Sequence, residues 1–299
     1  MLYNNFLMGV INIKLTYIVL KEDEGKKVGN ILRDKLNVSS RLLNKLKMNG
    51  KILVNRTSVF SSYILHLNDE IEVNIDFEEE DNIIPEKMNL DILYEDDYLL
   101  AINKPFGTVV HPSSYHPNKT LANGVKYYLN NNKKIRAINR LDRDTSGIVL
   151  FAKNEYIQEL MIKNIKIEKE YLALTIGKLP KNKDTINAPI ARKDGSIMER
   201  CILENGQTAI THYDVIKYIE DKNISIVHLK LETGRTHQIR VHLAYIGNSI
   251  LGDSLYGNET NLINRQALHA YKTSFIHPIT KEEINITSPL PNDIAALIK

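Results

Sequence analysis

The chain has 299 residues, of which 43% are hydrophobic and 25% are charged. This composition is that of an ordinary soluble globular protein rather than of a fibrous or disordered chain. Its one cysteine, Cys201, excludes a disulfide framework and a thiolate metal site within the chain, and favours a reducing cytoplasm.

The first twenty residues, MLYNNFLMGVINIKLTYIVL, are fairly apolar. They lack a basic leader and a small-residue cleavage site, and Lys14 interrupts the apolar run. We therefore predict a strand here, not a signal peptide or a membrane span, and we expect no membrane partner.

Residues 25–75 have the pattern of a small basic α/β unit. Apolar residues recur at helical spacing in KKVGNILRDKL and again in SSRLLNKLKMNG, so each stretch predicts a helix. Ser39 or Ser40 can cap the second helix, and the Asn-Gly pair at 49–50 ends it. The stretch that follows, KILVNRTSVF, predicts a strand, a turn and a second strand.

The net charge of +3 hides an uneven distribution along the chain. Residues 26–68 carry a local charge of +8, residues 69–97 carry −12, and residues 98–299 carry +8. Two basic regions joined by an acidic segment suggest a polyanionic partner bound at two places, although surface lysines also cluster by chance.

The acidic stretch IDFEEEDNIIPE, with its single proline, predicts an exposed linker, because it cannot bury enough apolar surface to fold alone. The predicted organisation is therefore a small basic domain over residues 1–75, a linker over 76–88 and a larger domain over 89–299.

Beyond residue 89, strands and helices alternate irregularly. DDYLLAINKP, GIVLFAKN, KEYLALTIGKL and ISIVHLKLE predict strands, whereas TGRTHQIRVHLAYIG predicts a helix. That helix has Thr233 or Thr236 available as its cap and Gly247 as its stop. This order predicts an α+β fold, with a mixed and largely antiparallel sheet flanked by helices and loops.

The stretch NRLDRDTSG, residues 139–147, concentrates polar residues just before an apolar run. A calcium loop starting at Asp142 would need a carboxylate at its twelfth position, where Lys153 stands, so we exclude a metal here. Turn chemistry accounts for the residues from Asp144 to Ser146, and Gly147 allows a positive φ. The preceding Arg140 and Asp142 are left without a structural explanation.

This stretch resembles the catalytic motif of the RluA-type pseudouridine synthases. NKPFGTVVHPS, KEYLALTIG and TGRTHQIRVHL resemble further motifs of that family, in the right order, and GDSLYG and LHAYKTSFIHPIT resemble its closing segments. The basic unit over 25–75 resembles the S-four-type RNA-binding domain that often precedes this catalytic domain. Several long motifs in order are far more specific than one short pattern.

The resemblance implies an enzyme that isomerises uridine in RNA to pseudouridine and needs no cofactor or metal. Asp142 would be the nucleophile, Arg240 its charge partner, and Tyr171 would pack against the target base. Arg140 would enter the RNA and help to displace the uridine from its stack. The residues implied as further RNA contacts are Lys104, Lys169, Arg235, Arg41, Lys45 and Lys47.

Two positions depart from the family pattern. The family usually has His before the arginine of its catalytic motif, where this chain has Asn139, and the RNA-binding unit usually has Asn-Gly at its hairpin, where this chain has Asn55 and Arg56. Neither position touches the nucleophile. The histidines at 111, 116, 237 and 242 are interpreted as solvated or RNA-contacting residues, because their spacing does not suit a metal site.

Two other functions remain open at this point. A non-catalytic RNA-binding protein could retain the same scaffold, and a carboxylate-dependent nucleoside hydrolase could use the same aspartate. The hydrolase does not explain the basic amino-terminal unit. The expected partner is RNA, with ribosomal RNA favoured and transfer RNA possible by family analogy, and the expected state is a monomer.

Overall fold

The computed structural model describes residues 13–75, 77, 81–129, 134–258 and 260–299. The predicted strand near the amino terminus is observed as β1 (Ile13–Ile18), and residues 1–12 lie outside the described ranges. None of the helices in these ranges is long and apolar enough to cross a bilayer.

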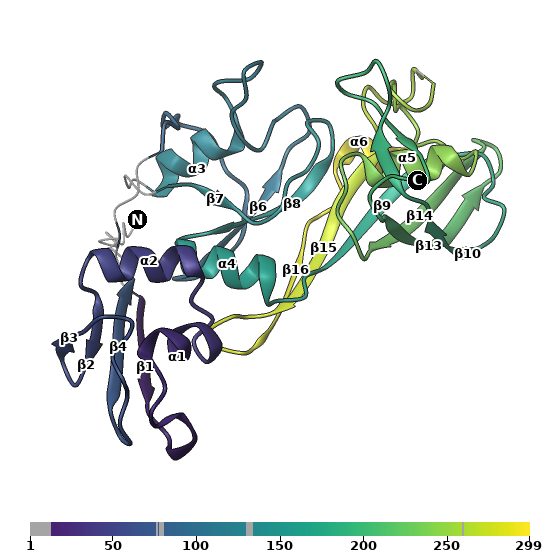
Figure 1. Ribbon diagram of the computed structural model, residues 1–299. Coiled ribbons are helices and arrows are strands. Elements are labelled where there is room, and N and C mark those ends of the chain that lie inside the picture. The colour runs from purple at the N-terminus through teal and green to yellow at the C-terminus, as the bar shows by residue number, and fades with distance from the viewer. Residues whose placement is uncertain (1–12, 76, 78–80, 130–133, 259) are drawn as a thin grey trace.

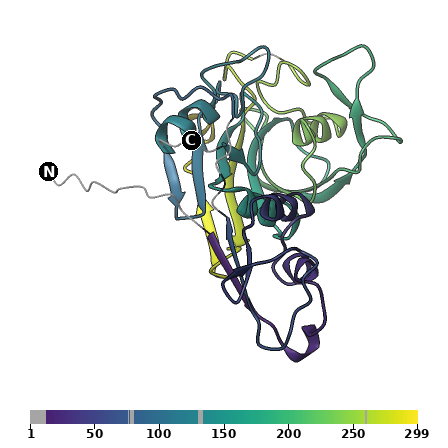
Figure 2. The same cartoon turned by 60° about the vertical axis from the view of Figure 1, so that its left-hand side comes forward.

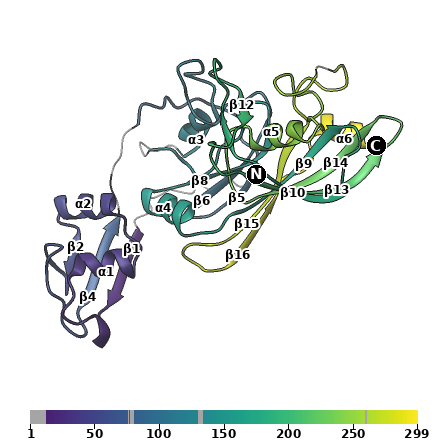
Figure 3. The same ribbon diagram turned by 45° about the vertical axis from the view of Figure 1, so that its right-hand side comes forward.

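The amino-terminal part forms a separate four-stranded antiparallel sheet in the order β1-β4-β2-β3 (Figures 1 and 3). Its further elements are the 3-10 turn η1 (Lys21–Asp23), α1 (Val28–Asp34), α2 (Ser40–Met48), β2 (Ile52–Val54), β3 (Thr57–Ser58) and β4 (Glu70–Ile75). Both helices bury their leucines and isoleucines against this sheet. The predicted helices and hairpin are therefore confirmed.

Local chemistry explains where α2 begins and where the hairpin turns. The Ser39 hydroxyl accepts a hydrogen bond from Leu42 N at 3.1 Å, so Ser39 is the cap, and Gly50 ends the helix with φ of +61°. At the β2–β3 turn, Asn55 and Arg56 both adopt positive φ, which Asn tolerates better than Arg.

A second sheet forms the larger part of the molecule, with ten strands (Figures 1 and 2). Its main path runs β10-β13-β14-β9-β15-β8-β6-β5, and β16 and β7 pair with β15 and β8. All of its pairs are antiparallel except β15 with β8. The α+β fold with a mixed, largely antiparallel sheet is thus observed as predicted.

The bounds of these elements are as follows. The strands are β5 (Ile92–Glu95), β6 (Leu99–Lys104), β7 (Arg136–Ala137), β8 (Ser146–Ala152), β9 (Glu168–Ile176), β10 (Lys183–Asn187), β13 (Ile210–Ile219), β14 (Ile224–Leu231), β15 (Leu268–Ile276) and β16 (Glu283–Thr287). The helices are α3 (Leu121–Leu129), α4 (Glu155–Lys163), α5 (Gln238–Tyr245) and α6 (Asn292–Ile298). A hairpin of β11 (Ile190–Arg192) and β12 (Arg200–Ile202) stands apart from the sheet.

The two ends of α5 test the predicted cap and stop. The helix is preceded by His237 in a left-handed conformation, so neither Thr233 nor Thr236 caps it. Thr233 instead accepts from Ile210 N at 2.9 Å and donates to Gln238 at 2.9 Å, which ties the loop to β13. The predicted stop at Gly247 is confirmed by its φ of +84° just beyond the helix.

The small sheet and the large sheet meet through α4, which lies beside α2 (Figure 1). Glu155, at the start of α4, is buried and accepts from Lys45 Nζ at 2.6 Å, with Arg41 Nε at 3.3 Å. The Tyr156 hydroxyl donates to Leu36 O at 2.9 Å. These contacts hold the basic side of α2 against the larger part of the molecule.

The acidic stretch after β4 is more tightly attached than the sequence predicts. Its described residues form no helix or strand, as expected of a linker. However, Asp81 bonds Lys126 Nζ at 2.9 Å and Ile135 N at 2.7 Å, and Glu86 accepts from Lys119 N at 2.9 Å. The prediction of an exposed linker is therefore wrong for Asp81, which bonds two buried residues, whereas Ile84 and Pro85 are exposed as predicted.

The start of β8 packs very closely against β15. Gly147 has φ of +113°, and a Cβ there would lie 2.1 Å from Ala270 O, so this position requires glycine. The neighbouring Ser146 hydroxyl bonds His269 Nδ1 at 2.9 Å, and both side chains are buried. Burial lowers the pKa of His269 to about 4.

This histidine predicts sensitivity of the fold to acid. Because the pKa of His269 is about 4 when folded and about 6.5 when unfolded, the unfolded state binds more protons between these values, and stability falls as pH falls through this window. Between pH 7.5 and pH 5 the loss through this group is about 2 kcal/mol. In urea unfolding, the free energy of unfolding of His269→Gln should fall less between pH 7.5 and pH 5 than that of wild type. The control His66→Gln, at an exposed histidine, should lose as much stability as wild type.

Candidate active site

The loop between β7 and β8 carries the stretch NRLDRDTSG and opens onto a cavity. A turn closed by Thr145 N donating to Asp142 O at 3.1 Å brings the Asp142 carboxylate toward it, about one-fifth exposed. The cavity has a volume of about 60 Å³ and is lined by Arg140, Leu141, Asp142, Thr145, Tyr171, Leu231, Arg235, His237, Gln238, Ile239, Arg240 and Leu268.

Lys104 holds this loop from inside the protein. Its ammonium donates to three backbone carbonyls, Pro105 O and Thr108 O at 2.8 Å and Arg143 O at 2.9 Å. The side chain has no exposed surface, and burial lowers the pKa of Lys104 to about 7. The prediction that Lys104 contacts RNA is wrong for this structure, because the side chain is enclosed and its donors are used.

The side chains of Asp144, Thr145 and Ser146 do not make the local turn bonds that the sequence predicts. The Asp144 carboxylate bonds the Arg143 guanidinium at 2.9 to 3.2 Å rather than a nearby backbone N–H. The Thr145 hydroxyl accepts from Gln266 at 3.2 Å, and Ser146 bonds His269. These side chains fasten the loop to β15 and its preceding segment, which sequence proximity alone does not reveal.

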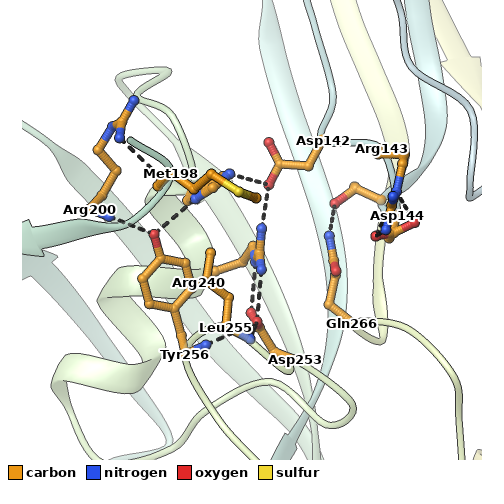
Figure 4. Close-up of polar contacts among 12 residues, drawn as sticks. Asp142, Arg143, Asp144, Met198, Arg200, Arg240, Asp253, Leu255, Tyr256 and Gln266 are labelled. Atoms are coloured by element: carbon orange, nitrogen blue, oxygen red, sulfur yellow. Dashed lines mark hydrogen bonds and ion pairs between the residues drawn. The ribbon is translucent and has the colours of Figure 1, made fainter. Parts of the chain in front are cut away.

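Arg240, which lines the cavity, links two carboxylates, those of Asp142 and Asp253 (Figure 4). Its Nε and Nη2 bond Asp253 at 2.7 and 2.8 Å, and its Nη1 reaches the Asp142 carboxylate at 3.2 Å. Asp253 has no exposed surface, and its carboxylate also accepts from Leu255 N and Tyr256 N. The pKa of Arg240 is raised by these two carboxylates against the opposing effect of burial, so the arginine stays charged beside Asp142.

His237 and Tyr256 form a second series of contacts that leads to the Asp142 carboxylate. The Tyr256 hydroxyl accepts from Arg200 N at 2.8 Å, so its own proton is available for His237 Nδ1 at 2.8 Å. We therefore assign the His237 proton to Nε2, which lies 3.8 Å from Asp142. Burial lowers the pKa of His237, which favours this neutral form.

The interpretation of His242 as a solvated or RNA-contacting residue is wrong, and His237 is not solvated, although it lines the cavity. His237 is only 14% exposed and is engaged with Tyr256, while its backbone adopts the strained left-handed conformation before α5. His242 has no exposed surface and bonds Thr211 and Ala188 O, each at 2.9 Å.

Tyr171, on β9, forms one wall of the cavity. The side chain is 7% exposed, and burial together with the nearby charge of Asp142 raises the pKa of its phenol. The hydroxyl therefore keeps its proton at neutral pH, and the side chain lines the same cavity as the Asp142 carboxylate. Asp142, Tyr171 and Arg240, the predicted catalytic residues, thus meet at one cavity although they come from distant parts of the chain.

The predicted RNA contacts separate into groups. Arg140 is exposed at the cavity, and Arg235 also lines it while its Nε donates to Thr208 O at 2.9 Å. Lys169 lies outside this lining, half-buried in a neighbouring hollow, and burial lowers its pKa. In the small unit, Lys47 is exposed, whereas Arg41 and Lys45 pair with Glu155.

Sequence reasoning missed two members of the site, Asp253 and Tyr256. Both stand in GDSLYG, a segment noted for its resemblance but given no role. The acidic and aromatic residues of this segment were the features of the sequence that could have marked it as part of the site. Within the described ranges, no group of three or more His, Cys, Asp or Glu side chains is arranged to hold a metal ion.

Comparison with known proteins places this site in a family. Residues 98–245 match the family described as RNA pseudouridylate synthase, and they include Asp142, Tyr171 and Arg240. A solved structure, human RNA pseudouridylate synthase domain containing 1, superposes with a TM-score of 0.56 at 28% identity. The match covers 67% of this chain and 83% of that chain.

Similarity extends over nearly the full length of curated relatives. The chain is 38% identical to the uncharacterised RNA pseudouridine synthase YhcT of Bacillus subtilis, over 95% of this chain and 96% of that protein. It is 33% identical to the ribosomal large subunit pseudouridine synthase D of Xanthomonas campestris, over 87% and 83% of the two chains. The chain therefore belongs to the RluA-type RNA pseudouridine synthases and is an enzyme of that family.

Proposed function

We propose that this enzyme isomerises specific uridines in structured RNA with Asp142 as the nucleophile. The observation that supports this most is the position of the Asp142 carboxylate, in a cavity, 3.2 Å from an arginine that Asp253 holds by two further bonds. A charged guanidinium at this distance favours the ionised carboxylate and fixes its direction. Among the described residues, the other titratable groups that line the cavity are Tyr171, His237 and three arginines.

The isomerisation breaks the bond between uracil and ribose, turns the base and rejoins it through carbon. Atoms and electrons balance within the nucleotide, so no external group or oxidant is required. Asp142 would form a bond to the nucleotide, and this bond would break again as the base rejoins the ribose through carbon, which regenerates the carboxylate. The proton lost from that carbon of the base is balanced by the proton gained at the nitrogen that leaves the ribose. Tyr171, protonated at neutral pH, would pack its ring against the freed base and offer its hydroxyl for proton transfer.

The depth of the site supports base flipping. Asp142 and Tyr171 line a recessed cavity, so a uridine stacked within paired RNA could not reach them without leaving its stack. Unstacking costs a few kcal/mol, and phosphate contacts can offset this cost. Arg140, exposed at the cavity, would fill the place that the uridine leaves.

Ribosomal RNA is the RNA class that we propose. A relative that is 33% identical over most of both chains is named for the large ribosomal subunit. The basic sheet-and-helix unit up to β4 would be an S-four-type RNA-binding domain, with the catalytic domain over residues 89–299. The exposed Lys47 would contact phosphate directly. Arg41 and Lys45 would leave their ion pairs with Glu155 and contact phosphate when RNA binds. We further propose that the enzyme acts as a cytoplasmic monomer.

Pseudouridine mapping of ribosomal and transfer RNA tests this proposal. Cells that lack the protein should lose pseudouridine at one or more ribosomal positions, and a plasmid copy should restore it. Asp142→Asn should not restore it, whereas the control Asp221→Asn, at an exposed loop residue, should. Loss confined to transfer RNA would overturn the RNA class. Restoration by Asp142→Asn would overturn the nucleophile, and the absence of any lost site would contradict the function.

A further inference from the structure

Asn139 joins the core sheet to the catalytic loop through its side chain. Its Nδ2 donates to Ile148 O at 3.1 Å, and its Oδ1 accepts from Leu150 N at 2.8 Å. Both partners are backbone groups of β8, in residues that are 2% and 1% exposed. The side chain therefore makes one donated and one accepted bond to the same strand, as a neighbouring peptide unit would.

The chain needs such a substitute at this point. β7 pairs with β8 only through Arg136 and Ala137, and Ile138 N adds one more bond to Leu150 O at 2.8 Å. After that the main chain leaves β8, because the residues that follow must enter the cavity. Without the Asn139 amide, two buried backbone groups of β8 would lose the partners that it provides, which is costly in a protein interior.

We propose that Asn139 is a positioning residue for the catalytic loop. By replacing a peptide unit in the ladder, its side chain lets the main chain turn away from β8 at a defined residue. Leu141 is then anchored in the core, and Arg140 and Asp142 are presented to the cavity on either side of it. The role of Asp142 as nucleophile is taken from the proposed function, whereas the anchor itself rests only on the contacts of Asn139.

The chemistry of the anchor predicts opposite pH profiles for two substitutions. A neutral imidazole at 139 can accept from Leu150 N or donate to Ile148 O, whereas a protonated imidazole has only donors and would oppose Leu150 N–H. Activity of Asn139→His should therefore fall as pH falls. An ionised carboxylate has no donor for Ile148 O, whereas a protonated one does, so activity of Asn139→Asp should rise as pH falls.

Single-turnover rates of purified enzyme at saturating RNA test this directly. The substrate is a transcript containing the uridine that the mapping experiment identifies, and the rates are compared with wild type at each pH from 5 to 8.5. We expect Asn139→Ala to be at least about tenfold slower throughout, a loss of about 1.4 kcal/mol. The rate of Asn139→His relative to wild type should be highest at pH 8 and should fall at least fivefold by pH 5. The rate of Asn139→Asp relative to wild type should instead rise as pH falls from 8 to 5.

The matched control is Asn285→Ala, at an exposed asparagine of β16 whose amide bonds Glu283 at 3.1 Å. It should match wild type at every pH. Wild-type rates for Asn139→Ala, or parallel pH profiles for the His and Asp variants, would overturn the proposal. So would a lower melting temperature of Asn139→Ala with an unchanged rate, because that result assigns the amide to stability alone.

Amide hydrogen exchange at Leu150 separates this inference from the proposed function. The Leu150 amide donates to Asn139, so its exchange should quicken at least tenfold in Asn139→Ala and remain slow in Asn285→Ala. This readout needs no substrate. If exchange quickens but wild type modifies no RNA, the anchor stands and the proposed function fails. If exchange is unchanged, the anchor is wrong whatever the activity.

Discussion

Replacement of Asp142 by Asn should lower the single-turnover rate of pseudouridine formation by at least about 10⁴-fold. An amide has nearly the shape of a carboxylate but is no nucleophile, so the covalent step should be lost. The side chain is partly exposed, and Arg240 keeps both of its bonds to Asp253, so the fold should tolerate the change. The measurement is the rate at saturating RNA, together with RNA affinity and melting temperature.

RNA affinity within about threefold of wild type would place the defect in the chemical step. The control is Asp144→Asn, two residues along the same loop, whose carboxylate bonds the exposed Arg143 rather than facing Arg240. It should lose much less than Asp142→Asn. Equal losses for the two variants would attribute the defect to loop structure, and a modest loss for Asp142→Asn would rule out its role as nucleophile.

Replacement of Arg240 by Met should destabilise the protein by about 3–5 kcal/mol and also reduce activity. The guanidinium is the partner of Asp253, which has no exposed surface, so its removal leaves a buried charge with only the two backbone donors. It also removes the cation that orients Asp142. Urea unfolding measures the first effect, and single-turnover kinetics at saturating RNA measure the second.

A double variant separates these two effects. In Arg240→Met combined with Asp253→Asn, no buried charge is left unpaired, and the new amide oxygen can still accept from Leu255 N and Tyr256 N. Stability should recover by about 2 kcal/mol or more relative to the single Arg240 variant. Activity should stay low, since Asp142 still lacks its cation. Recovery of both properties would show that Arg240 acts on the fold alone.

The predictions are accurate where the stabilising contacts join residues that are close in the sequence, and fail where the partners are distant. Helix α2, its Ser39 cap and its glycine stop were predictable, because the stabilising bonds join residues only a few positions apart. The meeting of Asp142, Tyr171 and Arg240 came from family resemblance, since these residues are distant in the chain and no local pattern places them together. Their location at one cavity agrees with that resemblance.

The incorrect predictions concern long-range partners. The family resemblance implied an RNA contact for Lys104, yet three carbonyls satisfy its ammonium in the interior, one of them 39 residues away. Thr233 had the right chemistry for a helix cap, but β13 offered it a backbone N–H instead. The carboxylate of Asp81 was expected in solvent and is used by donors from residues 126 and 135.

The class of fold, the local helices and hairpins, and the residues that the family resemblance marks for catalysis could all be predicted from the amino-acid sequence. These features depend on periodicity, on capping chemistry and on motifs that are continuous along the chain. How the Asp142 loop is held, through Lys104, Asn139 and Arg240, became clear from the packed fold. Buried polar groups take whichever partner the packed chain brings within hydrogen-bond distance, and that choice is not written in any local stretch.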